Sequence, residues 1–197
     1  MEIYLTFDDG PDPAGTPNVL ASLRRARTVA TFFVIAPKAR RYPRLISEMQ
    51  RAGHRVEFHC AEHIRHTERT REEIEEDTSS GLRDLKALGI EPGIWRTPWG
   101  VTESWTGEVA DRFGLELTSW TADTHDWRRD TAPEMLKSVA SLLRPDAIVL
   151  MHDGLGPGAR RTDCAETAAL VEPLVHRVRA LGCEPSTMKI TRRASLT

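Results

Sequence analysis

The chain has few cysteines, no long apolar run and no excess of basic side chains, and each shortage excludes a class of protein. Its 197 residues include three cysteines without a C-x-x-C spacing, which does not describe a disulfide framework and favours a reducing compartment. The formal net charge of -2 provides no basic surface for nucleic acid. No stretch is as long and apolar as a transmembrane helix. We therefore expect neither a nucleic-acid partner nor a membrane span.

The N-terminus also lacks the pattern of a signal peptide, because no basic region precedes an apolar run and a small-residue cleavage site. Residues 2–7 instead predict a first strand. The simpler explanation is a cytoplasmic protein, and the alternative is a chain from which a secretion signal has been removed. The sequence makes no prediction about the oligomeric state.

Strand and helix patterns alternate along the chain. Runs of β-branched and aromatic residues predict strands over 2–7, 31–35, 54–58, 93–95, 115–120 and 147–151. Helical spacing and capping signals predict helices over 16–27, 43–52, 70–88, 106–113, 132–143 and 162–181. Thr70 with Glu73 predicts a capping box. Alternation of this kind implies parallel β-α-β units, as a barrel or an open sheet, in one α/β domain over 1–197.

Polar side chains recur just after the predicted strands. They are Asp8, Asp9, His59, His63, Arg96, Asp123, Asp126 and His152. In parallel α/β folds the loops after the carboxyl ends of the strands share one face, so residues far apart in sequence meet there. The sequence therefore predicts that these side chains converge on one site.

Within this set, His59 and His63 are spaced so that one helical turn would point both rings the same way. Two histidines with one carboxylate are a common ligand set for a catalytic divalent ion. The spacing alone is equally compatible with a surface pair. Zincin chemistry is excluded because Cys60 stands where its glutamate would be.

Asp8 and Asp9 are ambiguous by themselves, since adjacent carboxylates often occupy a solvated turn or cap a helix. Their functional interpretation is a division of labour, in which one ligates the metal and its neighbour accepts a proton from the bound water. Metal binding lowers the pKa of that water, so a carboxylate can act as the base near neutral pH.

Six segments together resemble the polysaccharide deacetylases, also called NodB-homology carbohydrate esterases. The segments are Thr6-Phe7-Asp8-Asp9-Gly10-Pro11, Ala30-Thr31-Phe32-Phe33-Val34, His59-x-x-x-His63, Arg96-Thr97-Pro98-Trp99-Gly100, Asp123-Thr124-His125-Asp126-Trp127 and Leu150-Met151-His152. The resemblance covers about residues 3–185. It implies an α/β fold, a distorted (β/α) barrel with fewer than eight complete units. It also implies hydrolysis of an acetyl amide or ester, with N-acetyl expected.

The resemblance further assigns roles to residues. Asp9, His59 and His63 would bind one divalent ion, most often Zn2+, with Co2+ or Ni2+ as alternatives. Asp8 would be the general base and His152 the general acid.

The supporting roles follow in the same way. Arg96 would orient Asp8, and Asp123 would hold His152 in its charged form. The backbone N–H of Trp99 would help to hold the oxyanion. The family usually has Ser or Thr where this chain has Cys60, and a thiol is a weak donor, so we expect the loop between the histidines to be held differently. Cys60 itself could be a buried thiol, a redox-sensitive neighbour or an extra ligand.

The expected partner is an acetylated sugar. Trp99 and Trp127 follow predicted strands, where indoles could stack on a sugar face or simply pack in the core. A sugar polymer, an amino sugar and a sugar-containing metabolite all remain open as substrates. Two other functions also remain open: hydrolysis of another non-peptide C–N bond, such as a formyl or cyclic amide, and a non-catalytic glycan-binding protein.

Overall fold

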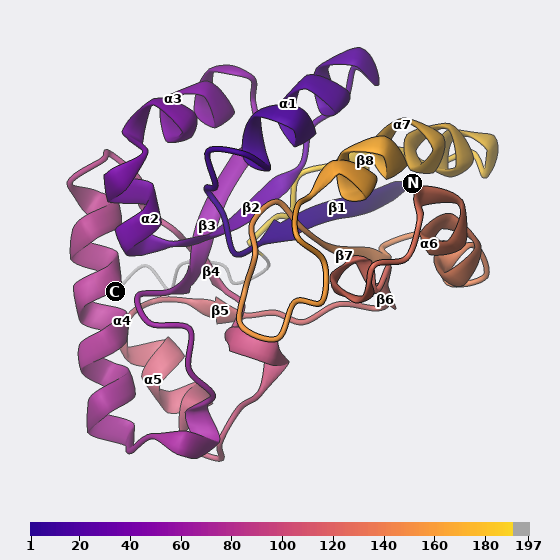
Figure 1. Cartoon of the computed structure of the whole chain (residues 1–197). Helices are drawn as coiled ribbons and strands as arrows, with labels where there is room; N and C mark the ends of the chain where they lie inside the picture. The colour runs from indigo at the N-terminus through magenta and orange to yellow at the C-terminus, as the bar shows by residue number, and fades with distance from the viewer. Residues whose placement is uncertain (191–197) are drawn as a thin grey trace.

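A curled, all-parallel sheet forms the centre of the computed structural model, which describes residues 1–190 (Figure 1). The strands are β1 (Glu2–Asp8), β2 (Thr31–Ile35), β3 (Arg55–Cys60), β4 (Ile94–Trp95), β5 (Glu116–Leu117), β6 (Ala122–Asp123), β7 (Ile148–His152) and β8 (Glu184–Ser186). Their order is β5-β4-β3-β2-β1-β7-β6, and β8 pairs with the start of β1. This is the expected distorted barrel with fewer than eight complete units, and that prediction is confirmed.

Seven α-helices and three short 3-10 helices connect the strands. They are α1 (Thr16–Arg25), α2 (Ala36–Arg41), α3 (Pro43–Arg51), α4 (Arg71–Lys86), α5 (Thr106–Arg112), α6 (Ala132–Val139), α7 (Ala165–Ala180), η1 (His66–Glu68), η2 (Pro98–Gly100) and η3 (Asp126–Arg128) in the described chain. The α-helices lie around the outside of the sheet in Figure 1. The main apolar core lies between them and the strands, with Phe7, Phe32 and Phe58 among its fully buried side chains.

The inner side of the curl is narrower and more polar. A small cluster of Phe33, Ile94 and Met188 fills one part of it. Thr6 and Arg96 are buried there as well. Successive side chains of a strand point to opposite faces of the sheet, so the same strands supply apolar residues to the outer core and polar residues to the inner side.

The register places the strand ends together. Asp8 pairs with His152 of β7 on one edge of β1 and with Phe33 of β2 on the other. Because all these strands run the same way, the turns that follow them open on a single face. The capping box of Thr70 and Glu73 at the start of α4 is confirmed, with both hydrogen bonds present.

Three features differ from the sequence-based expectation. The strand expected over 115–120 is confined to the two residues of β5, and β6 forms beyond its predicted end, at the opposite end of the sheet order. The helix α2 and the strand β8 were not expected. Both are short, and tertiary packing rather than periodicity defines them. The domain predicted over 1–197 ends in seven residues, 191–197, that lie outside the described residues.

Among residues 1–190, none of the helices combines the length and the apolar character that crossing a membrane requires.

Candidate metal centre and its acid and base

The turn after β1 separates two adjacent carboxylates. Asp8 ends the strand, while Asp9 has a left-handed backbone with φ of 70°. Lys38 of α2 donates a hydrogen bond of 2.8 Å to the carbonyl oxygen of Asp9. Both carboxylates are buried, and they point at different partners: Asp8 at Arg96 and Asp9 at the histidines. The two adjacent carboxylates therefore have different partners, as the division of labour predicted from the sequence requires.

Glycine at position 10 is required by packing. A side chain there would collide with the carboxyl group of Asp153, which lies buried beneath the turn. The hydroxyl of Thr16 donates to Asp153. Burial raises the pKa of Asp153 to about 7.

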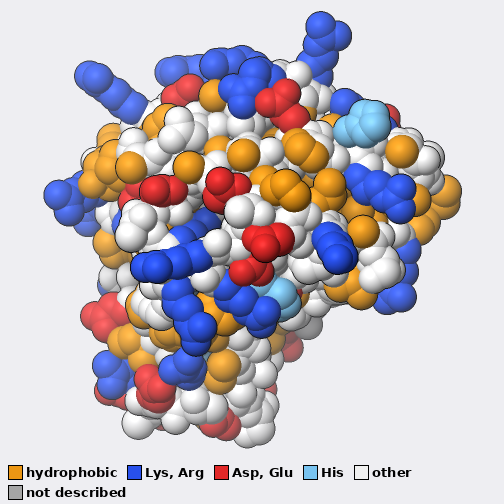
Figure 2. Space-filling model, turned by 45° about the vertical axis from the view of Figure 1, so that its right-hand side comes forward, with side chains coloured by type: hydrophobic (Ala, Val, Ile, Leu, Met, Phe, Trp, Pro, Cys, Tyr) orange, Lys and Arg blue, Asp and Glu red, His pale blue; other side chains and the backbone are white. Residues whose placement is uncertain are grey.

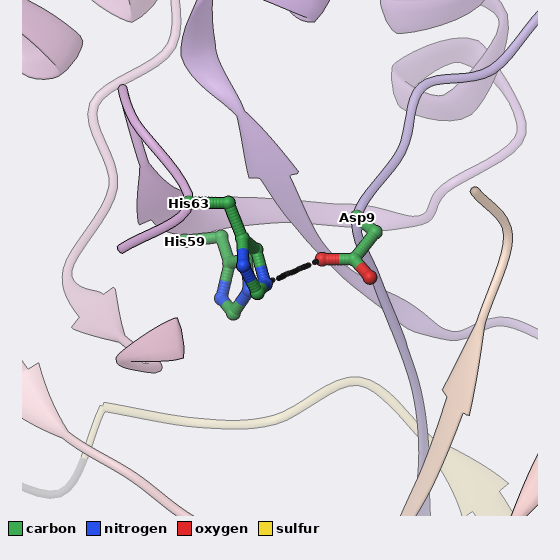
Figure 3. A group of neighbouring side chains, drawn as sticks. All are labelled: Asp9, His59 and His63. Atoms are coloured by element: carbon green, nitrogen blue, oxygen red, sulfur yellow. Dashed lines mark ion pairs between the residues drawn. The ribbon is translucent and has the colours of Figure 1, made fainter. Parts of the chain in front are cut away.

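His59, His63 and Asp9 converge at one point (Figure 3). His59 lies on β3, and His63 lies in the loop that follows it. Asp9 Oδ1 is 3.3 Å from Nε2 of His59 and 3.1 Å from Nε2 of His63. The three ligand atoms all lie within 4.8 Å of one another. The residues expected to form a metal site are therefore brought together.

The ring of His59 shows why a cation fits between them. Its Nδ1 lies 2.7 Å from the carbonyl oxygen of Arg96. A carbonyl oxygen only accepts, so Nδ1 carries the proton and Nε2 of a neutral ring presents a lone pair. That lone pair faces the carboxylate oxygen of Asp9, and two acceptors repel unless a cation lies between them.

The loop between the two histidines is held from α4. Asp77 accepts hydrogen bonds from the backbone N–H groups of Ala61 at 3.1 Å and of Glu62 at 2.6 Å. Burial raises the pKa of Asp77, against the effect of these two hydrogen bonds. Cys60 is buried, and burial raises the pKa of its thiol well above the usual value, as expected for an inert side chain.

Arg96 contacts Asp8 as the sequence predicted. The guanidinium is fully buried, and its Nη1 donates to Asp8 Oδ1 at 2.8 Å and to the hydroxyl of Thr6 at 2.7 Å. The ring of Phe33 lies beneath the guanidinium, 4.1 Å from its central carbon. These contacts fix the orientation of the Asp8 carboxylate.

The partner of His152 is Asp126, and the expectation that Asp123 holds it was wrong. Asp126 Oδ1 lies 2.7 Å from His152 Nδ1, and its other oxygen accepts from the backbone N–H of His152 and from Arg161. Asp123 lies in the turn before His125, which has a left-handed backbone with φ of 57°. The Asp123 carboxylate then accepts from the backbone N–H of His125 at 2.7 Å.

Asp126 sets the charge of His152. Burial lowers the pKa of His152, but the charge and hydrogen bond of Asp126 dominate and raise it to about 9. Burial raises the pKa of Asp126, but the charge and hydrogen bond of His152 and the charge of Arg161 outweigh burial and lower it, so this carboxyl stays ionised. With Nδ1 held by Asp126, the Nε2 proton of the ring is the one left to be given away.

A cavity of about 410 Å³ is lined by Asp8, Asp9, His59, His63 and His152. Trp99 and Trp127 contribute to its wall, and Asp123 lies there as well. The loop between β7 and α7, seen in orange in front of the sheet in Figure 1, passes directly over the Asp9 carboxylate. A side chain at Gly156 would collide with the Asp9 carboxylate, so glycine is required there.

Three residues around the site were not assigned roles by the sequence. Asp126 carried a signal, since it follows a strand and belongs to the Asp-x-x-Asp-Trp segment. Asp77 lies inside a helix and Arg161 inside a loop, and nothing in their local sequence connects either residue to the site. Their positions follow only from how α4 and the 153–164 loop pack.

Comparisons with known proteins agree with this geometry. The sequence model of the family described as polysaccharide deacetylase matches residues 1–118. A chitooligosaccharide deacetylase of a Bradyrhizobium species is 36% identical over 186 residues, covering 91% of this chain and 84% of the relative. A peptidoglycan-N-acetylglucosamine deacetylase of Bacillus cereus is 33% identical over 154 residues, covering 77% and 72%.

A solved structure has the same fold. The family 4 carbohydrate esterase from Streptomyces lividans, in complex with acetate, superimposes with a TM-score of 0.85 at 25% identity. The match covers 94% of this chain and 91% of the esterase.

Proposed function

Because this chain belongs to the polysaccharide deacetylase family, we propose that it is a metal-dependent hydrolase that removes the N-acetyl group from an amino sugar unit. The observation that carries the proposal is the joint placement of three metal-type ligands and an acid–base pair at the strand ends around β1. Asp9, His59 and His63 face one point, and Asp8 and His152 are register partners on adjacent strands. A glycan-binding protein has no need of such an acid and base.

The ligand set supports one divalent ion held by Asp9, His59 and His63, and two imidazoles with one carboxylate favour Zn2+. When bound, such an ion supplies Lewis acidity and lowers the pKa of a coordinated water.

Asp8 is the proposed base. Its carboxylate accepts the proton of the attacking water, and the Arg96 guanidinium at 2.8 Å keeps it in position. Buried Arg96 is itself fixed by Thr6 and by the ring of Phe33. The base therefore acts without reorienting during the reaction.

His152 is the proposed acid. The amine leaving group of an amide is a poor one and departs only when protonated, so the site needs a group that is still charged at neutral pH. Asp126 provides this by raising the pKa of His152 to about 9. The proton passes from Nε2 to the leaving nitrogen. The backbone N–H of Trp99, which has a left-handed φ of 54°, is the proposed donor to the developing oxyanion.

Acetate release tests the proposal. The metal-loaded protein is incubated with N-acetylglucosamine oligomers, free N-acetylglucosamine and acetylxylan, and with an N-formyl amino sugar as the alternative substrate. We expect acetate from an N-acetyl substrate and none with the Asp8→Asn variant. Release of formate without acetate would show that the protein is a deformylase and not a deacetylase. Absence of any acid from every substrate would reject the proposed activity.

A further inference from the structure

One arginine of the cavity wall is buried instead of reaching into solvent. Figure 2 shows many Lys and Arg side chains standing out from the surface of the protein. The side chain of Arg161 is only 8% exposed, although this residue belongs to the loop between β7 and α7 and lines the cavity. Burying a guanidinium is unfavourable unless its N–H groups find acceptors and its charge finds a partner. The partners of Arg161 therefore indicate its role.

Arg161 connects four separate segments of the chain. Its Nη1 donates to Asp126 Oδ2 at 3.0 Å and to the hydroxyl of Thr167 at the start of α7. Its Nη2 donates to the carbonyl oxygens of His152 at 3.0 Å and of Gly154 at 3.2 Å. Thr167 in turn donates to Asp126 Oδ2 at 2.7 Å. One guanidinium thus binds the carboxylate that holds the proposed acid, the backbone of the acid itself, the covering loop and α7.

The charge of Arg161 is needed most when the acid has given up its proton. Asp126 is fully buried, and while the ring of His152 is protonated the two groups form an ion pair at 2.7 Å. Without Arg161, loss of that proton would leave Asp126 as a buried carboxylate with no counter-charge, which is strongly unfavourable. Arg161 at 3.0 Å supplies the counter-charge in both states of the ring. Asp126 can therefore keep its charge and position throughout the proton transfer.

The same arginine holds the loop that covers the cavity. Gly154, Gly156 and Pro157 of this loop line the cavity, and the backbone at Gly156 lies against the Asp9 carboxylate. With glycine at three of the positions 154–158, the loop has few side chains of its own with which to hold one conformation. The hydrogen bonds of Arg161 fasten it to the end of β7. The position of the loop and the position of the acid therefore depend on one side chain.

We propose that Arg161 is a positioning residue of the deacetylation reaction, which holds the His152–Asp126 pair and the covering loop in one arrangement around the leaving group. The inference rests on the proposed function and adds a residue to it. In the reaction, water adds to the acetyl carbon and gives a proton to Asp8, the C–N bond breaks, and the leaving nitrogen takes the Nε2 proton of His152. Arg161 contacts none of the reacting atoms and acts through Asp126.

Two acetyl compounds with different leaving groups separate positioning of the acid from general stability. An N-acetylglucosamine tetramer needs a proton on its leaving nitrogen, whereas 4-nitrophenyl acetate releases a phenolate that departs without one. The measured quantity is the ratio of kcat/KM for the amide to kcat/KM for the ester, with metal-loaded protein. Because both values come from the same preparation, the ratio does not change when part of a variant is unfolded.

The variants are Arg161→Gln, Arg161→Lys and His152→Ala, with Arg160→Gln as the matched control. Arg160 precedes Arg161 in the same loop, and its side chain is exposed. The control therefore removes a guanidinium from the loop without removing the contacts to the acid and its partner.

We expect the ratio to fall most in His152→Ala, because general acid catalysis contributes about 10²- to 10⁴-fold and acts on the amide. Arg161→Gln keeps the acid but frees it from its fixed position. The ratio should then fall by about 10-fold, less than the about 10²-fold that a misplacement of about 1 Å can cost. Arg161→Lys keeps a counter-charge for Asp126 and should recover part of the loss, while Arg160→Gln should match the unmodified protein.

A second measurement does not depend on turnover. The Nδ1 proton of His152, which lies between Nδ1 and Asp126 Oδ1 across 2.7 Å, should give a downfield proton NMR signal that is absent in His152→Ala. We expect this signal to be lost by exchange with water in Arg161→Gln and to persist in Arg160→Gln.

An unchanged ratio in Arg161→Gln, or losses of the same size for the amide and the ester, would overturn this inference and leave the deacetylase proposal intact. If the unmodified protein hydrolysed only one of the compounds, or neither, the Nδ1 signal would decide: its persistence in Arg161→Gln would overturn the positioning role, and its loss would support it. Absence of acetate from every acetylated compound would reject the deacetylase activity by itself, so the two failures are distinguishable.

Discussion

Removing the carboxylate of Asp77 should weaken metal binding although Asp77 is not a ligand. Its two oxygens hold the backbone N–H groups of Ala61 and Glu62, which lie between the ligands His59 and His63. His59 is fixed by the strand β3, but His63 depends on this loop for its position. Asp77→Ala therefore frees the second ligand while leaving the first in place.

The size of the effect follows from those two hydrogen bonds. Bonds to a charged acceptor contribute about 1.5–3 kcal/mol each, and water can replace them at the partly exposed Ala61 and exposed Glu62, so the lower end applies. Only the share of this free energy that keeps His63 in position affects the affinity for the metal. Residues that orient metal ligands change affinity by about 10- to 100-fold, or roughly 1.4–2.7 kcal/mol. We expect Asp77→Ala to weaken metal binding by that amount.

Competition with a chromogenic chelator measures the affinity for Zn2+, and thermal unfolding of the metal-free protein reports on the fold. Asp84→Ala is the matched control, because Asp84 lies on the same helix and pairs with an exposed arginine, Arg40. At saturating Zn2+ the Asp77→Ala variant should recover most of its turnover. Asp77→Asn keeps one acceptor oxygen, so its affinity for Zn2+ should lie between those of the unmodified protein and Asp77→Ala.

The reasoning would be refuted by an unchanged affinity in Asp77→Ala, within about twofold, together with a lowered unfolding temperature. That result would mean that Asp77 stabilises the packing of α4 on the loop but does not position His63 for metal binding. An equal loss of affinity in Asp84→Ala would also contradict it, because the effect would then belong to the helix in general.

The remaining predictions concern the acid, the base and the metal. Asp8→Asn should keep the metal and lose turnover by about 10²- to 10⁴-fold, as metal analysis and acetate release together can show; near-normal turnover would remove Asp8 as the base. Activity that needs protonated His152 is lost as the pH rises through the pKa of its ring, which Asp126 raises to about 9. Asp126→Asn should therefore move the alkaline limb of the pH–rate profile to lower pH, and Asp123→Asn should not; the opposite pattern would restore Asp123 as the partner. Metal analysis should find about one divalent ion per chain, lost in Asp9→Ala, and retention of the ion by that variant would argue against the ligand set.

The sequence was sufficient for the elements that local pattern controls. The run over 147–151 and the capping box at Thr70 predicted their elements, because alternation, capping and β-branched composition act within a few residues. The strand expected over 115–120 failed for the opposite reason. Only Glu116 and Leu117 of that range pair with a neighbouring strand, and the next strand, β6, forms beyond it at the other end of the sheet, because strand pairing rather than local pattern decides where each strand lies.

The sequence also predicted the candidate metal centre. Asp9, His59 and His63 lie at or just after the ends of two strands, and parallel strands bring their carboxyl ends to one face whatever the details of packing. The same argument placed Asp8 and His152 together, since they end neighbouring strands. Residue type and position at a strand end together determined these five groups.

Only the tertiary structure decided which residues support them. Asp126 rather than Asp123 holds His152, while the Asp123 carboxylate accepts from the backbone of His125, a residue with a left-handed φ between them. Asp77 reaches the loop between His59 and His63 from the middle of α4. A backbone dihedral and the packing of a helix on a strand leave no local mark in the sequence, whereas the order of strands and the chemistry of the residues that follow them do.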